Sequence, residues 1–214
     1  MNPEPNRNKQ VSTGRTPSAF ARIERLPPLL VVLYLAMLAS TIMFAVLIVL
    51  YVATRAHSGL PTGLHPFPRF FSLSTIVLLV SSYTVGQASR LYAQDDLGAL
   101  GRCLGATLLM GSVFAGLQLL GWRELMAQGV LFSGKASGTF VYLISALHVV
   151  HVLGGMLYLL ALLLRVLHAD RDAVRALVYI RNPFHRRQLR LLTTYWHFVD
   201  GLWVALFAVF LFLY

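Results

Sequence analysis

Five runs of predominantly apolar residues, each more than 20 residues long, constrain this chain more than any other feature. They lie at Leu29–Ala53, Phe70–Tyr92, Leu100–Trp122, Thr139–Leu164 and Leu191–Tyr214. A helix rises about 1.5 Å per residue, so roughly 20 apolar residues cross the hydrocarbon core of a bilayer. Because a spanning segment must satisfy its own backbone hydrogen bonds, we expect each run to be a transmembrane helix.

The composition agrees with this interpretation. Hydrophobic residues make up 57% of the 214 residues and charged residues only 12%, which is too apolar for a soluble domain of this size. The sequence therefore predicts an all-α, polytopic membrane protein. We expect a mobile cytoplasmic tail at residues 1–28 and a five-helix transmembrane domain at residues 29–214. Short loops predict an up-and-down bundle in which the helices pack in sequence order.

The distribution of basic residues predicts the orientation of the bundle. Of the 18 lysines and arginines, all but four fall on the side of the tail, the second loop and the fourth loop. The four on the opposite side are Arg55, Arg69, Arg123 and Lys135. Cytoplasmic loops are enriched in these residues, so we expect the N-terminus in the cytoplasm and the C-terminus outside. The net charge of +10 then fits contact with anionic lipid, and we expect no nucleic-acid partner.

Polar residues inside the predicted spans are the candidates for function. His148 and His151 are three residues apart on one helix face, as are His197 and Asp200 on the last helix, which also carries Trp196 and Trp203. Asp200 is the one acidic residue that falls within a predicted span. A buried carboxyl group without partners is costly, so we expect donors near it, such as His197 or tryptophan and tyrosine side chains. Small residues spaced by four, as at Gly101 and Gly105, Ser112 and Gly116, or Ser82 and Gly86, predict faces for helix–helix packing.

Haem or metal binding is an alternative role for these histidines, since imidazole is a common ligand. His148 and His151 on one helix cannot bind opposite faces of one haem, so a bis-histidine site needs His197 opposite one of them. The single cysteine, Cys103, leaves no disulfide, thiolate zinc site or covalent haem attachment within the chain. We expect a hydrogen-bonded network with a structural or lipid-contacting role, with no metal or cofactor in this chain, and a proton relay is a further alternative.

Several motifs together resemble subunit III of the haem-copper terminal oxidases. Residues 195–200 read Tyr-Trp-His-Phe-Val-Asp and are followed by Trp203, which is similar to the last helix of that family. The histidine pair with Gly154 and Gly155 resembles the family's fourth-helix pattern, and residues 72–84 resemble its serine-rich second helix. Phe114 to Gln118 and Leu38 to Ser40 are similar to the third and first helices. The resemblance covers the chain from about residue 29 and has the five-helix form of bacterial members.

This resemblance implies a non-catalytic subunit of a proton-pumping oxidase in aerobic respiratory electron transport, in a bacterial plasma (inner) membrane. In that family, haem and copper belong to subunit I, so the implied partners are subunits I and II and phospholipids. Subunit III stabilises subunit I, binds phospholipid in an interhelical cleft and supports proton uptake. The positions implied for the cleft are His148, His151, Trp196, His197, Asp200 and Trp203.

One departure from the family pattern leaves alternatives open. Where the family has an intramembrane glutamate after Leu-Ala-Ser on the first helix, this chain has Thr41. A proton-collecting role for that carboxylate therefore does not transfer to this chain. A nitric-oxide-reductase accessory subunit of the same fold is one alternative, and a free-standing haem-binding membrane protein is another.

Overall fold

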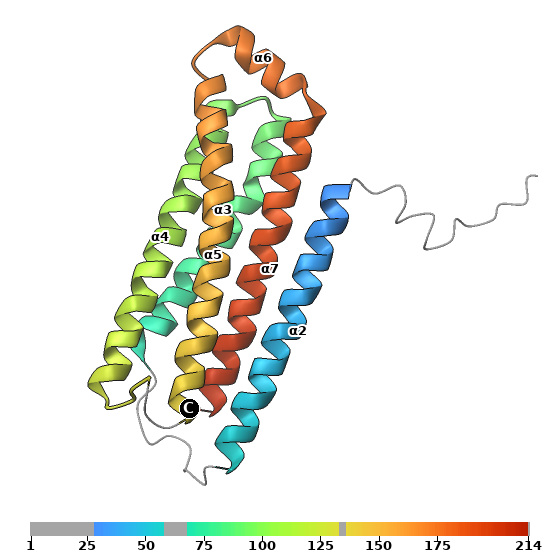
Figure 1. Cartoon of the computed structure of the whole chain (residues 1–214). Coiled ribbons are helices and arrows are strands. Elements are labelled where there is room, and N and C mark those ends of the chain that lie inside the picture. Colours follow the sequence, from blue (N-terminus) through green and yellow to red (C-terminus); the bar gives the residue numbers. More distant parts are fainter. Residues whose placement is uncertain (1–27, 58–67, 133–135, 214) are drawn as a thin grey trace, which may run out of the picture.

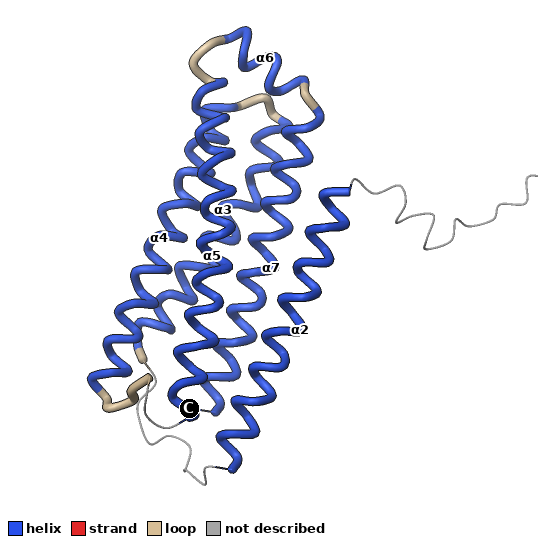
Figure 2. Tube along the Cα trace, in the orientation of Figure 1, coloured by secondary structure: helices blue, strands red, loops and turns tan. Residues whose placement is uncertain are grey.

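The computed structural model describes residues 28–57, 68–132 and 136–213, and all its regular structure is helical. The helices are α2 (Pro28–His57), α3 (Arg69–Ala93), α4 (Leu97–Ala127), α5 (Ala136–Ala169), α6 (Ala173–Arg181) and α7 (Pro183–Leu213). Five of them, all except α6, are long and apolar enough to cross a membrane. The prediction of an all-α protein with five membrane-spanning helices is confirmed (Figures 1 and 2). The predicted tail lies outside the described residues apart from Pro28, where α2 begins.

The long helices alternate in direction (Figure 1), and α3, α4, α5 and α7 form the body of the bundle. The helix α3 packs along α4 and α7, while α5 packs along α4 and α7. The expectation that the helices pack in sequence order is wrong for α2, whose main contacts are with α5 and α7. The reason lies in its aromatic side chains: Phe44 packs against the rings of His148 and His151 on α5, and Tyr51 against Phe210 on α7.

The fourth connection contains a helix that the sequence prediction missed. The sequence predicts a loop for the Arg-rich segment after the fourth span, but in the structure α5 continues to Ala169, α6 follows, and α7 begins at Pro183. Asp172 caps α6 by accepting a hydrogen bond from the backbone of Val174, and its carboxylate lies 3.6 Å from Arg175. Tyr179 is the buried residue of α6 and anchors the helix across the ends of α5 and α7. Hydropathy alone does not detect this helix because it is only nine residues long and two of them are arginines, so it contains no long apolar run.

Two clusters of buried side chains fill the bundle. One lies toward α6 and includes Leu104, Leu159, Leu192 and Trp196. The other lies toward the opposite end and includes Phe44, Phe114, Trp203 and Phe210. The candidate polar residues lie within or beside these clusters, so their hydrogen-bond partners and their burial depend on the packing of the surrounding helices.

Candidate functional site

The two tryptophans of the last helix connect α7 to α3. The indole Nε1 of Trp196 donates to Ser81 Oγ at 3.0 Å, and that of Trp203 donates to Thr75 Oγ1 at 2.9 Å. All four residues are buried. Trp196 and Trp203 are two helical turns apart, and their partners are six residues apart on the antiparallel α3, so the two bonds fix the relative register of these helices. The serine-rich face of α3 thus supplies acceptors for α7.

His197 and Asp200 meet the same helix but differ in exposure. His197 lies on the exposed side of α7, whereas only 4% of the Asp200 surface is exposed. Ser82 Oγ is 2.7 Å from His197 Nδ1, and Ser82 is also a hydrogen-bonding neighbour of the Asp200 side chain. Oδ2 of Asp200 is buried without a hydrogen-bond partner among the described residues. The expected donor near Asp200 is thus Ser82 and not an aromatic side chain, since the two indoles donate to other α3 hydroxyls and Tyr195 donates to the His151 carbonyl.

His148 and His151 lie in different surroundings although they share one helix. His148 is fully buried, its ring lies 4.9 Å from that of Trp203, and neither of its nitrogens has a partner among the described residues. His151 is half-buried, with Nε2 3.2 Å from Ser40 Oγ and Nδ1 2.8 Å from the Leu147 carbonyl. Tyr195 on α7 donates to the backbone carbonyl of His151 at 2.9 Å.

The three histidines contact partners on different helices. His151 is bonded to α2 and His197 to α3, and His148 is enclosed by aromatic rings. Within the described ranges, no group of three or more His, Cys, Asp or Glu side chains is arranged to hold a metal ion. The arrangement joins helices together and presents no common centre.

Thr41, at the position of the family's glutamate, faces away from these residues. Its side chain is exposed and donates to the Met37 carbonyl one turn earlier at 2.8 Å. The preceding Ser40 is the α2 residue that reaches His151. The network around His151 therefore uses a neutral hydroxyl from α2.

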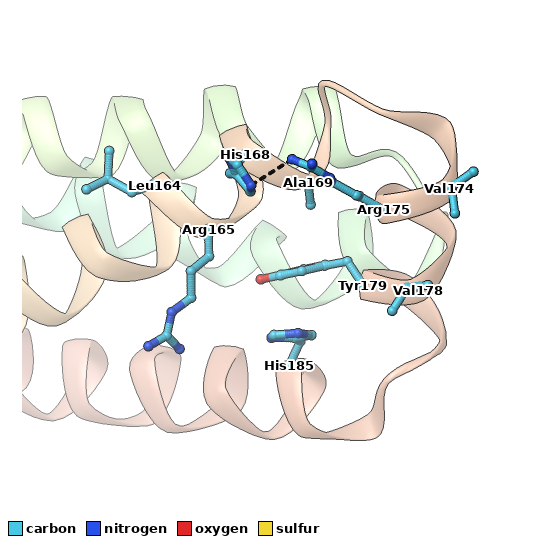
Figure 3. A pocket seen from close by; sticks show the side chains of 9 residues that line it. All are labelled: Leu164, Arg165, His168, Ala169, Val174, Arg175, Val178, Tyr179 and His185. Atoms are coloured by element: carbon cyan, nitrogen blue, oxygen red, sulfur yellow. Dashed lines mark hydrogen bonds between the residues drawn. The ribbon is translucent and has the colours of Figure 1, made fainter.

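A basic groove at the α6 end of the bundle is the site that sequence reasoning missed. Its volume is about 640 Å³, and Figure 3 shows its lining side chains, which come from α5, α6 and α7. Arg165, His168, Arg175 and His185 contribute its nitrogen groups, and Leu164, Val174 and Val178 contribute apolar walls. None of the six predicted cleft residues lines it. The run of arginines in the sequence was its signal, but the fold was needed to bring Arg165 and Arg175 to one groove.

Tyr179 forms the floor of this groove. Its ring stacks on that of His185 at 3.8 Å, and its hydroxyl, which points into the groove in Figure 3, is buried without a partner among the described residues. Burial raises the pKa of the Tyr179 hydroxyl to about 12, with a further contribution from Tyr92. At neutral pH the hydroxyl is therefore a donor without an acceptor among the described residues, in a groove that Arg165 and Arg175 also line.

Comparisons with known proteins agree with the motifs and the fold. The profile of the family described as cytochrome c oxidase subunit III matches residues 29–214. A probable cytochrome c oxidase subunit 3 from Mycobacterium bovis is 32% identical over 182 residues, which cover 82% of this chain and 84% of that protein. Cytochrome c oxidase subunit 3 from Bacillus sp. PS3 is 30% identical, over 79% of this chain and 78% of that protein.

A relative with a different electron donor in its name also matches. Cytochrome bo(3) ubiquinol oxidase subunit 3 from Pseudomonas aeruginosa is 28% identical over 178 residues, which cover 82% of this chain and 80% of that protein. The match of the family profile includes all five long helices. This chain is a multi-pass membrane protein that belongs to the cytochrome c oxidase subunit III family.

Proposed function

We propose that this chain is the non-catalytic third subunit of a proton-pumping haem-copper terminal oxidase in a bacterial plasma membrane. It stabilises subunit I, which carries haem and copper, within a complex that also contains subunit II. The observation that carries the proposal is the family match over residues 29–214. The contacts of Trp196 and Trp203 support it, because these polar groups join α7 to α3 and are not free for chemistry.

Affinity purification through a tag on this chain tests the proposal. We expect a membrane complex with the absorbance of haem, bound copper, and oxygen consumption driven by cytochrome c or quinol. A complex that consumes nitric oxide and lacks oxygen reduction would instead support the accessory subunit of a nitric-oxide reductase. Recovery of the chain without any haem-bearing partner would contradict both assignments.

Phospholipid binding is the second part of the proposal, and the basic groove is its most suitable site. Arg165 and Arg175 offer cationic donors, the Tyr179 hydroxyl is an unpaired donor, and Leu164, Val174 and Val178 form apolar walls. A phosphate diester with acyl chains combines the charge and the apolar surface that such a lining requires. The location at the end of α5, beside the arginine-rich side of the bundle, suits a headgroup at the membrane surface.

Loss of the two groove arginines tests this lipid site. We expect Arg165→Ala with Arg175→Ala to lower the anionic phospholipid that remains bound to the purified complex. The matched control is Arg187→Ala with Arg190→Ala, which removes the same charge from exposed positions outside the groove. Equal lipid content in the two double variants, measured by mass spectrometry of extracted lipid, would show that the groove is not selective.

Support of proton uptake into subunit I is the third part, and Asp200 tests how this chain contributes. The Asp200 side chain is buried at the α3–α7 contact, next to Ser82. We predict that Asp200→Asn weakens assembly or lipid retention more than it changes the chemistry of oxygen reduction. Measurements of subunit composition, bound lipid and turnover on the same preparation separate these effects. Unchanged composition with a sharply lower intrinsic turnover rate would contradict the prediction.

A further inference from the structure

The outward side of α7 carries a polar group where the membrane offers it no partner. His197 lies about 21 Å from the start of α7 at Pro183 and about 24 Å from its end at Leu213. The hydrocarbon core is about 30 Å thick, so His197 lies inside it wherever that layer falls along an upright α7. Its imidazole is exposed on the protein surface. Unlike lysine or arginine, histidine has too short a side chain to reach the interface from this depth.

One of the two ring nitrogens of His197 is already used. Nδ1 bonds to Ser82 Oγ at 2.7 Å, which fixes the ring against α3. A Cβ atom placed on Gly86 would lie 3.8 Å from Nε2, so the ring extends over this exposed glycine. Nε2 has no hydrogen bond among the residues that the structure describes. Acyl chains cannot supply one, and a polar group left unpaired in hydrocarbon is costly.

The surface beside His197 is shaped for the close approach of another helix. Gly201 is exposed, one turn after His197, and nothing lies within 4 Å of a Cβ atom built on it. Ala205 follows one turn later and is also exposed. Small residues at this spacing allow two helix backbones to approach closely in lipid, and polar side chains between helices add hydrogen bonds. His197, Gly201 and Ala205 therefore combine an unpaired polar atom with a shallow surface.

We infer that the outward face of α7, defined by His197, Gly201 and Ala205, docks a transmembrane helix of the haem-bearing subunit I, which presents a hydrogen-bonding side chain to His197 Nε2. This inference rests on the proposed function, because it requires a complex in which this chain has membrane partners. The inference goes beyond the proposed function because it assigns the docking face and the chemistry of the contact.

Equivalent glycines on other faces provide matched controls. Gly116 on α4 and Gly154 on α5 are also exposed, and nothing lies within 4 Å of a Cβ atom built on either. Leucine at Gly201, Gly116 or Gly154 therefore fits the isolated subunit equally well. It blocks a partner helix only at the face where one docks.

The experiment is purification of the tagged full chain from membranes, with haem per chain measured by absorbance. For the wild type we expect haem to co-purify, and for Gly201→Leu we expect at least about a tenfold loss of haem per chain. Gly116→Leu and Gly154→Leu should retain the wild-type ratio. An unchanged ratio in Gly201→Leu, or an equal loss in all three variants, would overturn the docking face while leaving the proposed function intact. Absence of haem from the wild type would overturn both.

His197 variants decide the matter if Gly201→Leu fails to accumulate in the membrane. His197→Gln keeps a side chain that can bond to both Ser82 and a partner, whereas His197→Phe keeps the ring volume without the nitrogens. We expect His197→Gln to retain the partner and His197→Phe to lower haem per chain. Equal haem content in the two variants would contradict a hydrogen bond from the partner to His197.

Discussion

The contacts that hold α7 and those that hold α2 differ in kind. Side-chain hydrogen bonds from Trp196, His197 and Trp203 attach α7 to α3. The helix α2 is held by aromatic contacts of Phe44 and Tyr51 and by the hydrogen bond between Ser40 and His151. In the most apolar 18-residue window of α2, only 6% of the residues are buried, against 33% in the corresponding windows of α3 and α7. Since lipid gives no hydrophobic drive for helix association, packing and polar contacts decide which helices form one stable unit.

This difference predicts a rigid body of α3, α4, α5 and α7 with α2 attached more weakly. The largest effect is expected at Trp203, which is fully buried against Phe114, Phe71 and His148. Trp203→Ala should lower the free energy of unfolding by about 3–5 kcal/mol, because it leaves a cavity in the body of the bundle. Unfolding by SDS in detergent micelles measures this change, and Val204→Ala, at an exposed position, is the control. A loss no larger than the control would show that Trp203 does not support the bundle.

The next effect separates the two regions. Phe44→Ala removes the aromatic side chain through which α2 contacts His148 and His151. We expect α2 to move away from α5. The helices α3 and α7 should stay in register, because the hydrogen bonds from Trp196 to Ser81 and from Trp203 to Thr75 remain intact. Spin labels on exposed sites of α2 and α5, and a second pair on α3 and α7, measure the two distances. Equal broadening of both distance distributions would contradict a separable α2.

Single hydrogen bonds should give smaller losses that differ between the regions. Thr75→Val removes the buried acceptor of the Trp203 indole, and we expect a loss of about 1–2 kcal/mol because the indole N–H is left unpaired. Ser40→Ala removes the partly buried partner of His151, and we expect about 0.5 kcal/mol. Both are measured by unfolding in the same micelles. A larger loss for Ser40→Ala would reverse the proposed order of the two regions.

The effect that is smallest at neutral pH concerns α6 and appears only at alkaline pH. The pKa of Tyr179 is raised by burial to about 12 from an ordinary value near 10, so the folded state favours the neutral hydroxyl. Its contribution to stability is fully present below pH 10 and is lost as the pH rises through 12. Tyr179→Phe should remove this part of the pH dependence and cost little at pH 7, because the hydroxyl has no described partner. The free energy of unfolding of the wild type and of Tyr179→Phe is measured between pH 9 and pH 12. The same pH dependence in both proteins would contradict the prediction.

The sequence predicted the membrane-spanning helices well because their signal is the length of each apolar run. It underestimated their ends, since helices continue past the hydrocarbon: α7 begins at Pro183 and not at Leu191. It missed α6 because a short helix with Tyr179 as its one buried residue has no long apolar run. The order of the helices in the sequence also did not predict the neighbours of α2, because the ring contacts of Phe44 and Tyr51 place it against α5 and α7.

The candidate site was predicted as a set of residues and not as an arrangement. Spacing placed His197 and Asp200 on one side of a helix, but the structure exposes His197 and buries Asp200. The tryptophans find acceptors on α3, which no spacing within α7 could show. The small-residue pairs were similarly mixed. A Cβ atom built on Gly101 would lie 3.3 Å from Leu167 on α5, whereas one built on Gly105 or Gly116 would have nothing within 4 Å. The basic groove depends on three helices meeting, and Arg165 and Tyr179 are 14 residues apart in the chain.

The measurement closest to the central claim is removal of this chain from the purified oxidase, followed by absorbance spectra and turnover of what remains. If the chain supports chemistry located in subunit I, the haem and copper content should be unchanged and oxygen reduction should begin at a comparable rate. We then expect activity to decline faster during sustained turnover, with recovery when the chain is added back. Loss of haem or copper in proportion to the chain removed would contradict the account.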